Sequence, residues 1–216
     1  MSDSHLIFAS NRRRVLCAVA SFLTIVFPLL HASDASSAED DGLQVVGLVE
    51  AAGGEAFAEI KEKRRMLEPA SPIYLNDQVG TGSDSRIALR LGEHTKIQLG
   101  ERARLKIDRF LLNTGGDITL DTGAMLFEKR DGRPMPFSVR TAYGVIDVRG
   151  TRFFAGPSNN VFGVFVDEGS VTVTAGGRRV TLRAGEGTDI SKPGARPTAP
   201  KRWGQPRIKA AYASVQ

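Results

Sequence analysis

The sequence predicts an all-β protein in which many short strands form a meander, a solenoid-like coil or a sandwich within a single domain. The first observation behind this prediction is that apolar residues alternate with polar ones in short runs, which is typical of strands with one buried face. The second is composition: 23 of the 216 residues are glycine and only 7% are aromatic, so the chain turns often and packs mainly with Val, Ile and Leu. The body contains no segment with the spacing of a long amphipathic helix.

The first 38 residues have the order of a secretory signal peptide. Three consecutive arginines precede an uncharged apolar run at 15–30, and small residues follow it. We therefore expect residues 1–38 to direct export to the periplasm, with cleavage after Ala35 or Ala38. The alternative is an uncleaved inner-membrane anchor, but the 16 residues of the run are fewer than the about 20 that span a bilayer.

A β domain is expected at 43–191. It begins with two runs, 43–50 and 56–60, which flank Gly53-Gly54 and so predict a hairpin. Residues 76–85 are rich in turn formers and include carboxylates that a calcium ion could use. No glutamate stands at the spacing of a calcium loop, which favours a solvated turn.

The clearest strands are three alternating segments at 86–91, 96–99 and 104–107, each with one apolar and one polar face. Gly-Glu pairs separate them, and the weak repeat predicts a meander or solenoid-like stack. Further strands are expected at 118–120, 124–128, 161–166, 170–174, 180–182 and near 190, with a tight turn at 167–169.

The most informative stretch lies between these strands. Two runs of β-favouring residues, 137–141 and 145–148, predict paired strands, and Gly150 predicts a bulge or a close backbone approach. In an extended strand Asp147 and Arg149 share one face and are able to pair.

The tail at 192–216 has six basic residues and no acidic one, whereas residues 39–191 are nearly neutral, with 20 basic and 22 acidic side chains. Its four prolines disfavour a helix or a central strand, so we expect an extended and mobile segment. One interpretation is a solvated linker. The other is contact with an anionic envelope surface, in which Trp203 sits at the interface among the cations.

The expected mature chain lacks the parts of common catalytic sites. Its single histidine, His94, has no second histidine or cysteine to complete a metal site, and Cys17 lies within the signal peptide. No serine stands in a Gly-x-Ser-x-Gly elbow. We therefore expect no enzyme activity, no catalytic residue, no cofactor, no metal and no nucleic acid partner.

Several motifs stand in a recognisable order. Residues 148–153 read Val-Arg-Gly-Thr-Arg-Phe, 166–171 read Val-Asp-Glu-Gly-Ser-Val and 182–186 read Leu-Arg-Ala-Gly-Glu. Together with 76–89 they make the chain, from about 45 to 190, resemble the FecR protein domain family. Signalling members of that family place a cytoplasmic anti-sigma region before a membrane helix and relay the state of an outer-membrane transporter to a sigma factor. Only 14 residues precede the apolar run here, so the resemblance implies a secreted, stand-alone member without that region.

Three functions remain open at this stage. The leading one is a non-catalytic protein-binding or scaffolding module of the cell envelope with an envelope protein partner. The alternative is a component of a signal-transduction system that regulates an ECF-type sigma factor, with a separate cytoplasmic partner. The third, a carbohydrate-acting enzyme, would need paired carboxylates, for which Asp117, Asp121 and Glu128 are candidates by composition.

The candidate partner-contact residues are cations of the 148–153 motif and three residues of the tail. Arg149 and Arg152 could contact an anion or a partner, or else Arg149 pairs with Asp147 while Arg152 is solvated. The full set is Arg149, Arg152, Lys201, Arg202 and Trp203.

Overall fold

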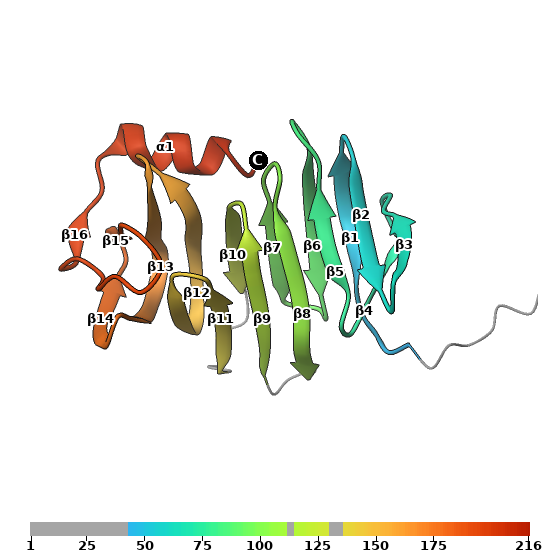
Figure 1. Cartoon of the computed structure of the whole chain (residues 1–216), viewed down its shortest axis with the longest axis horizontal. Helices are drawn as coiled ribbons and strands as arrows, with labels where there is room; N and C mark the ends of the chain where they lie inside the picture. Colours follow the sequence, from blue (N-terminus) through green and yellow to red (C-terminus); the bar gives the residue numbers. More distant parts are fainter. Residues whose placement is uncertain (1–42, 112–114, 130–135) are drawn as a thin grey trace, which may run out of the picture. The chain divides into compact units, whose positions relative to one another are not determined.

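The computed structural model describes residues 43–111, 115–129 and 136–216, which form sixteen strands and one short helix (Figure 1). This confirms the all-β prediction. The helix has nine residues, and no helix in the described ranges is long and apolar enough to cross a membrane. The expected signal peptide at 1–38 lies outside the described residues. The elements are β1 (Val45–Gly53), β2 (Ala56–Ile60), β3 (Lys63–Met66), β4 (Pro72–Tyr74), β5 (Gln78–Thr81), β6 (Arg86–Leu91), β7 (Thr95–Leu99), β8 (Arg104–Leu111), β9 (Gly115–Thr122), β10 (Met125–Lys129), β11 (Phe137–Thr141), β12 (Gly144–Ser158), β13 (Val161–Ala175), β14 (Arg178–Arg183), β15 (Glu186–Ile190), β16 (Lys201–Arg202) and α1 (Gln205–Ala213).

All strands belong to one sheet that curls over itself into two layers. One layer runs β3-β2-β5-β8-β9-β11, and the other runs β4-β1-β6-β7-β10. The long strand β12 joins them, because its first part pairs with β11 and its later part pairs with β10. Strand β13 follows β12 along its length, and β14 and β15 extend the two layers beyond it. The arrangement is thus a sandwich made from one bent sheet.

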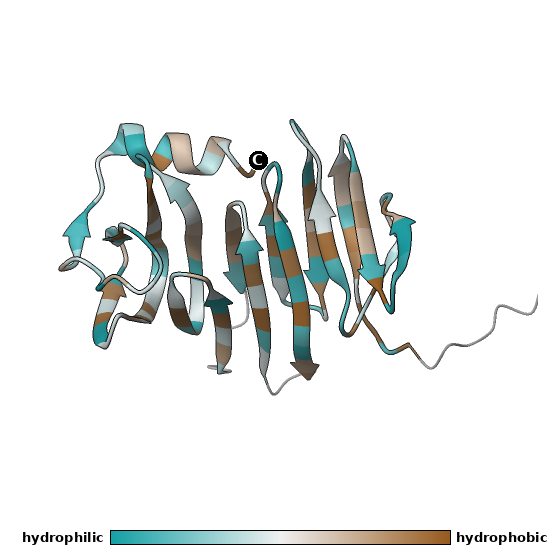
Figure 2. Ribbon diagram, viewed as in Figure 1, coloured by the Kyte–Doolittle hydropathy of each residue, from teal (hydrophilic) through white to brown (hydrophobic). Residues whose placement is uncertain are grey.

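The core lies between the two layers. Alternate residues of facing strands point inward and are fully buried, as the period-two pattern of the sequence predicted. Figure 2 shows the resulting apolar bands across neighbouring strands. Leu89, Ile97, Leu105, Phe127 and Phe153 are among the largest of these side chains.

Two predicted pairings are wrong. Strands β1 and β2 do not form a hairpin, because β1 pairs with β4 and β6 while β2 pairs with β3 and β5. The chain crosses between layers at this turn, with Gly54 at φ +79°. Of the meander and the solenoid-like stack predicted for 86–107, the meander is wrong, because β6 and β7 pair but β8 pairs with β5 and β9 in the other layer.

The predicted tight turn at 167–169 is wrong as well. Strand β13 continues through these residues and stays paired with β12. The register shifts between Arg149 and Arg152, so the bulge predicted at Gly150 is confirmed. Gly150 and Gly169 face each other across it at φ +54° and +79°. A Cβ on Gly169 would lie 2.6 Å from the Gly150 carbonyl oxygen. Glycine at this position therefore allows the two paired strands to approach closely at the bulge, and it does not mark a chain reversal.

The tail is ordered from Lys201 onward, which contradicts the expectation of an extended segment. Strand β16 pairs with β15, and α1 begins with a proline in its first turn, where its missing N–H costs little. The helix covers the outward side of the β10–β12–β13 layer and forms a second apolar cluster with it. That cluster contains Ala124, Leu126, Phe154, Phe165, Trp203, Ala211 and Val215.

Trp203 is the centre of this second cluster. Its ring stacks on Phe165 with centroids 5.2 Å apart and lies 6.4 Å from the Phe154 ring. The Arg207 guanidinium covers the indole at 3.6 Å from the ring centroid. Because only 7% of Trp203 is exposed, the expectation that it inserts into an anionic surface is wrong for the folded tail.

Asp189 on β15 holds the tail against the sheet by forming ion pairs with two of its cations. Lys201 Nζ lies 2.7 Å from its Oδ2, and Arg207 Nη2 lies 2.7 Å from its Oδ1. Burial alone would raise the pKa of Asp189, but hydrogen bonds and charge from Arg207 and Lys201 outweigh it and lower the pKa below its usual value. The carboxylate therefore stays charged in the folded state to lower pH than in the unfolded chain.

We expect Asp189→Asn to lower the free energy of unfolding by about 2 kcal/mol at pH 7, because Arg207 is left partly buried without its counter-charge. A lowered folded-state pKa gives stability that is present above the unfolded value, about 3.9, and is lost as the pH falls through the folded value. Urea unfolding at pH 7 and at successively lower pH should show the wild-type advantage shrinking below about pH 4. The exposed Glu62→Gln is the control; an equal effect of both variants, or a pH-independent gap, would contradict this role for Asp189.

Candidate partner-binding face

One outward surface of the sandwich carries mainly polar side chains. It consists of β11, residues 144–149 of β12, residues 170–175 of β13, and β14, whose inward residues belong to the core. Because strands alternate, the remaining side chains point to the outside. We call this surface the arginine face, and its outward residues are Ser138, Arg140, Val145, Asp147, Arg149, Ser170, Thr172, Thr174, Arg179, Thr181 and Arg183.

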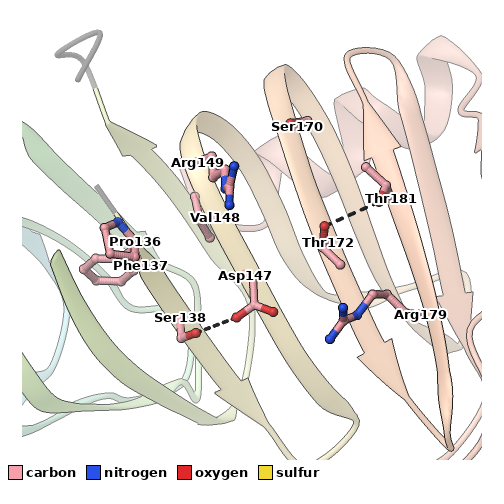
Figure 3. A pocket seen from close by; sticks show the side chains of 10 residues that line it. All are labelled: Pro136, Phe137, Ser138, Asp147, Val148, Arg149, Ser170, Thr172, Arg179 and Thr181. Atoms are coloured by element: carbon pink, nitrogen blue, oxygen red, sulfur yellow. Dashed lines mark hydrogen bonds between the residues drawn. The ribbon is translucent and has the colours of Figure 1, made fainter. Parts of the chain in front are cut away.

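The middle of the arginine face is a ladder of small polar side chains. The strand register places Ser138, Asp147, Thr172 and Thr181 in one line across four strands. The Ser138 hydroxyl donates to Asp147 Oδ1 at 2.7 Å, and the hydroxyls of Thr172 and Thr181 lie 3.4 Å apart (Figure 3). The ladder is the floor of a hollow of about 510 Å³.

Arginines stand on both sides of this ladder. On one side the register aligns Arg149 with Ser170 and Arg183, and on the other it aligns Arg140 with Thr174 and Arg179. Figure 3 shows Arg149 and Arg179 on opposite sides of the line of hydroxyls. All four guanidinium groups are on exposed residues, and two of them, Arg149 and Arg179, line the hollow.

These four arginines have no carboxylate partner within the described part of the chain. Asp147 is the one acid on the face, and it accepts from Ser138 instead of pairing with Arg149. The earlier alternative of an Asp147–Arg149 pair is therefore wrong. Some arginines elsewhere are neutralised: Arg64 of β3 pairs with Glu55 at 2.8 Å, and Arg109 pairs with Asp117 at 2.6 Å.

The structure separates the other predicted contact residues from Arg149. Arg152 lies beyond the bulge, where Nη1 is 3.4 Å from Asp167 Oδ2 and the guanidinium covers the Tyr212 ring at 5.4 Å, so it is not simply solvated. Lys201 pairs with Asp189, Arg202 is exposed on β16, and Trp203 is buried. Only Arg149 of the five thus belongs to the arginine face.

The carboxylates considered for an enzyme are apart. Asp117 is paired with Arg109, and Asp121 accepts from the Gln78 amide at 3.2 Å. Glu128 is on β10, in the other layer. Within the described residues no group of three His, Cys, Asp or Glu side chains could hold a metal ion. The solvated turn predicted at 76–85 is wrong in part, because Gln78–Thr81 form β5 and the Asp77 carboxylate is buried, where it accepts from Arg65 and from the Tyr74 amide.

Comparison with family models matches residues 77–172 to "FecR protein". Residues 77–172 thus match the FecR domain. This domain runs from the edge of β5 into β13, so it includes Arg140 and Arg149 and the first three members of the ladder. Arg179, Thr181 and Arg183 on β14 follow it directly and complete the arginine face.

Two crystal structures described as a "putative anti-sigma factor" from Parabacteroides distasonis ATCC 8503 share the fold. Each superposes with a TM-score of 0.53 at 16% sequence identity and covers 62% of this chain. The chain spans 62% and 63% of the length of those two chains. A search of curated proteins found no match.

Three of the four arginines on the face were missed from the sequence. Arg140, Arg179 and Arg183 come from strands that flank the FecR motif on either side of β12 and β13. Their alternation with buried Val139, Val180 and Leu182 is a local signal that they point outward. What no local pattern contains is the register across four strands that brings them around Arg149.

Proposed function

We propose that this chain is a non-catalytic protein-binding module of a signal-transduction system that regulates a sigma factor. The FecR domain and a fold shared with a protein described as an anti-sigma factor support a regulatory role. The signal-peptide pattern of 1–38 supports work in the periplasm, with a separate partner reaching the sigma factor.

The observation that carries this proposal is the arginine face. Exposed cations cost little in water, but this face has four without counter-charges, two of which line the hollow, and they are available to a partner. Arginine is enriched at protein interfaces because its planar group forms several hydrogen bonds and stacks on neighbouring side chains. A face of four adjacent strands is broad enough to contribute to an interface of about 800 Å² per partner.

The test is the transcriptional response to loss of the protein. We expect deletion of the gene to change a set of transcripts that share one sigma-factor promoter class, and complementation with the full chain to restore them. Envelope scaffolding would predict altered envelope integrity with no change in such a set. That outcome would contradict the regulatory proposal and favour the scaffold.

A further inference from the structure

We propose that the arginine face binds an acidic, extended protein segment laid along the hydroxyl ladder. This deepens the proposed function and rests on it in one respect, namely that the partner is a protein. The match to the FecR family ends at residue 172 and so leaves out β14. We infer the chemistry of the ligand from the ladder and from the two rows of arginines beside it.

Charge complementarity is the first argument. The four strands of the face contribute four outward arginines against the single Asp147, a surplus of three positive charges. Residues 39–191 as a whole have 20 basic and 22 acidic side chains, so the face is more positive than the average of these residues. A ligand of opposite sign is therefore attracted to this surface.

The geometry of the rows is the second argument. Residues two apart along a strand are about 6.7 Å apart, so each row of arginines stands about that far from the ladder. An extended segment lying on the ladder projects successive side chains to opposite sides. Its acidic side chains would then reach Arg149 and Arg183 on one side and Arg140 and Arg179 on the other.

The spacing within a row fits a peptide better than a single small anion. Arg149 and Arg183 are two strands apart, which is about 9.6 Å. One phosphate or sulfate cannot contact both, whereas carboxylates on alternate residues of a peptide are about 6.7 Å apart and side chains of Glu and Arg bridge the rest. Each contact can be bidentate. The hydroxyls of Thr172 and Thr181 below bond each other, which uses one of their two O–H groups and leaves the other to donate to a peptide carbonyl group.

The test is fluorescence anisotropy on the full chain with three labelled probes of similar length: octaglutamate, octaglutamine and a heparin octasaccharide. We expect octaglutamate to bind, octaglutamine not to bind, and the affinity for octaglutamate to fall with added salt. Arg149→Glu combined with Arg179→Glu should weaken octaglutamate binding at least about tenfold.

The matched control is Arg102→Glu combined with Lys209→Glu, which changes the net charge equally at exposed sites off the face and should keep the affinity within about twofold. Unchanged circular dichroism and thermal midpoint in both double variants establish that they are folded. Equal weakening by both double variants, or binding of octaglutamine, would overturn the proposal. Face-dependent binding of heparin without octaglutamate would overturn it in favour of an anionic polysaccharide. Either result leaves the transcriptional test of the proposed function untouched, so the two can fail separately.

Discussion

Replacing Trp203 by alanine is expected to lower the free energy of unfolding by about 3–5 kcal/mol, the range for removing a buried aromatic side chain. The indole holds together the second apolar cluster, with Phe165 on one face and Arg207 on the other. Its loss leaves a cavity between α1 and the sheet and exposes Phe154 and Phe165 to water. Urea unfolding measures the change.

The control for Trp203→Ala is Leu111→Ala, because Leu111 is 47% exposed at the end of β8. This change should cost well under 1 kcal/mol. If Trp203→Ala proved as mild as Leu111→Ala, the tail would not contribute to the stability of the domain. The packing of the tail against the sheet through Trp203 would then be wrong.

Replacing Gly169 by alanine is expected to cost about 3 kcal/mol, because strain and a collision act together. The residue sits at φ +79°, a conformation that a Cβ disfavours by about 1–2 kcal/mol. The added Cβ would also lie 2.6 Å from the Gly150 carbonyl oxygen and 2.7 Å from Thr151 Cγ2. These contacts belong to the bulge that carries β12 and β13 from one layer to the other.

Gly177 provides a matched control for this prediction. It has a similar φ of +75°, but a Cβ there meets no atom within 4 Å. Gly177→Ala should therefore cost only about 1 kcal/mol from backbone strain. Thermal or urea unfolding of the two variants separates the effect of the collision from that of the backbone strain. Equal losses in the free energy of unfolding would show that the bulge is loosely packed.

The strands were predictable from the sequence, whereas their partners were not. Alternation is local, so the runs around Leu89, Ile97 and Leu105 identify strands wherever they pair. Whether a glycine turn closes a hairpin or crosses between layers depends on distant contacts. At Gly54 the deciding neighbour is Ser85, whose hydroxyl accepts from the Glu55 amide at 2.9 Å. No pattern near residue 54 contains that information.

The docking of the tail had a signal that composition concealed. The prolines and cations of 192–216 are typical of a linker. The signal that something covers the sheet lies elsewhere, in three strands that have apolar residues on both faces. Leu126, Phe154 and Phe165 each stand between two inward-facing apolar neighbours. A doubly apolar stretch requires a cover on its outer side. Trp203 in the tail was the large apolar side chain available to supply one.

The site was predictable only in part. Arg149 was singled out together with Arg152 as a cation of the 148–153 motif, and the structure places Arg149 at the hollow. The bulge at Gly150 was predicted, but grouping Arg149 with Arg152 did not allow for its effect, which is to change the face on which the following side chains lie. The residues that stand around it come from β11 and β14, and their proximity follows from tertiary register alone.

The measurement that tests the account most directly is transcription from a promoter of the affected sigma-factor set in a deletion strain carrying one of three chains. The wild-type chain and the Arg102→Glu/Lys209→Glu variant should both restore the wild-type level. The Arg149→Glu/Arg179→Glu variant, present at the same amount and with the same thermal midpoint, should leave transcription as in the deletion strain. Full restoration by the Arg149→Glu/Arg179→Glu variant would show that the arginine face is not the surface through which this protein signals.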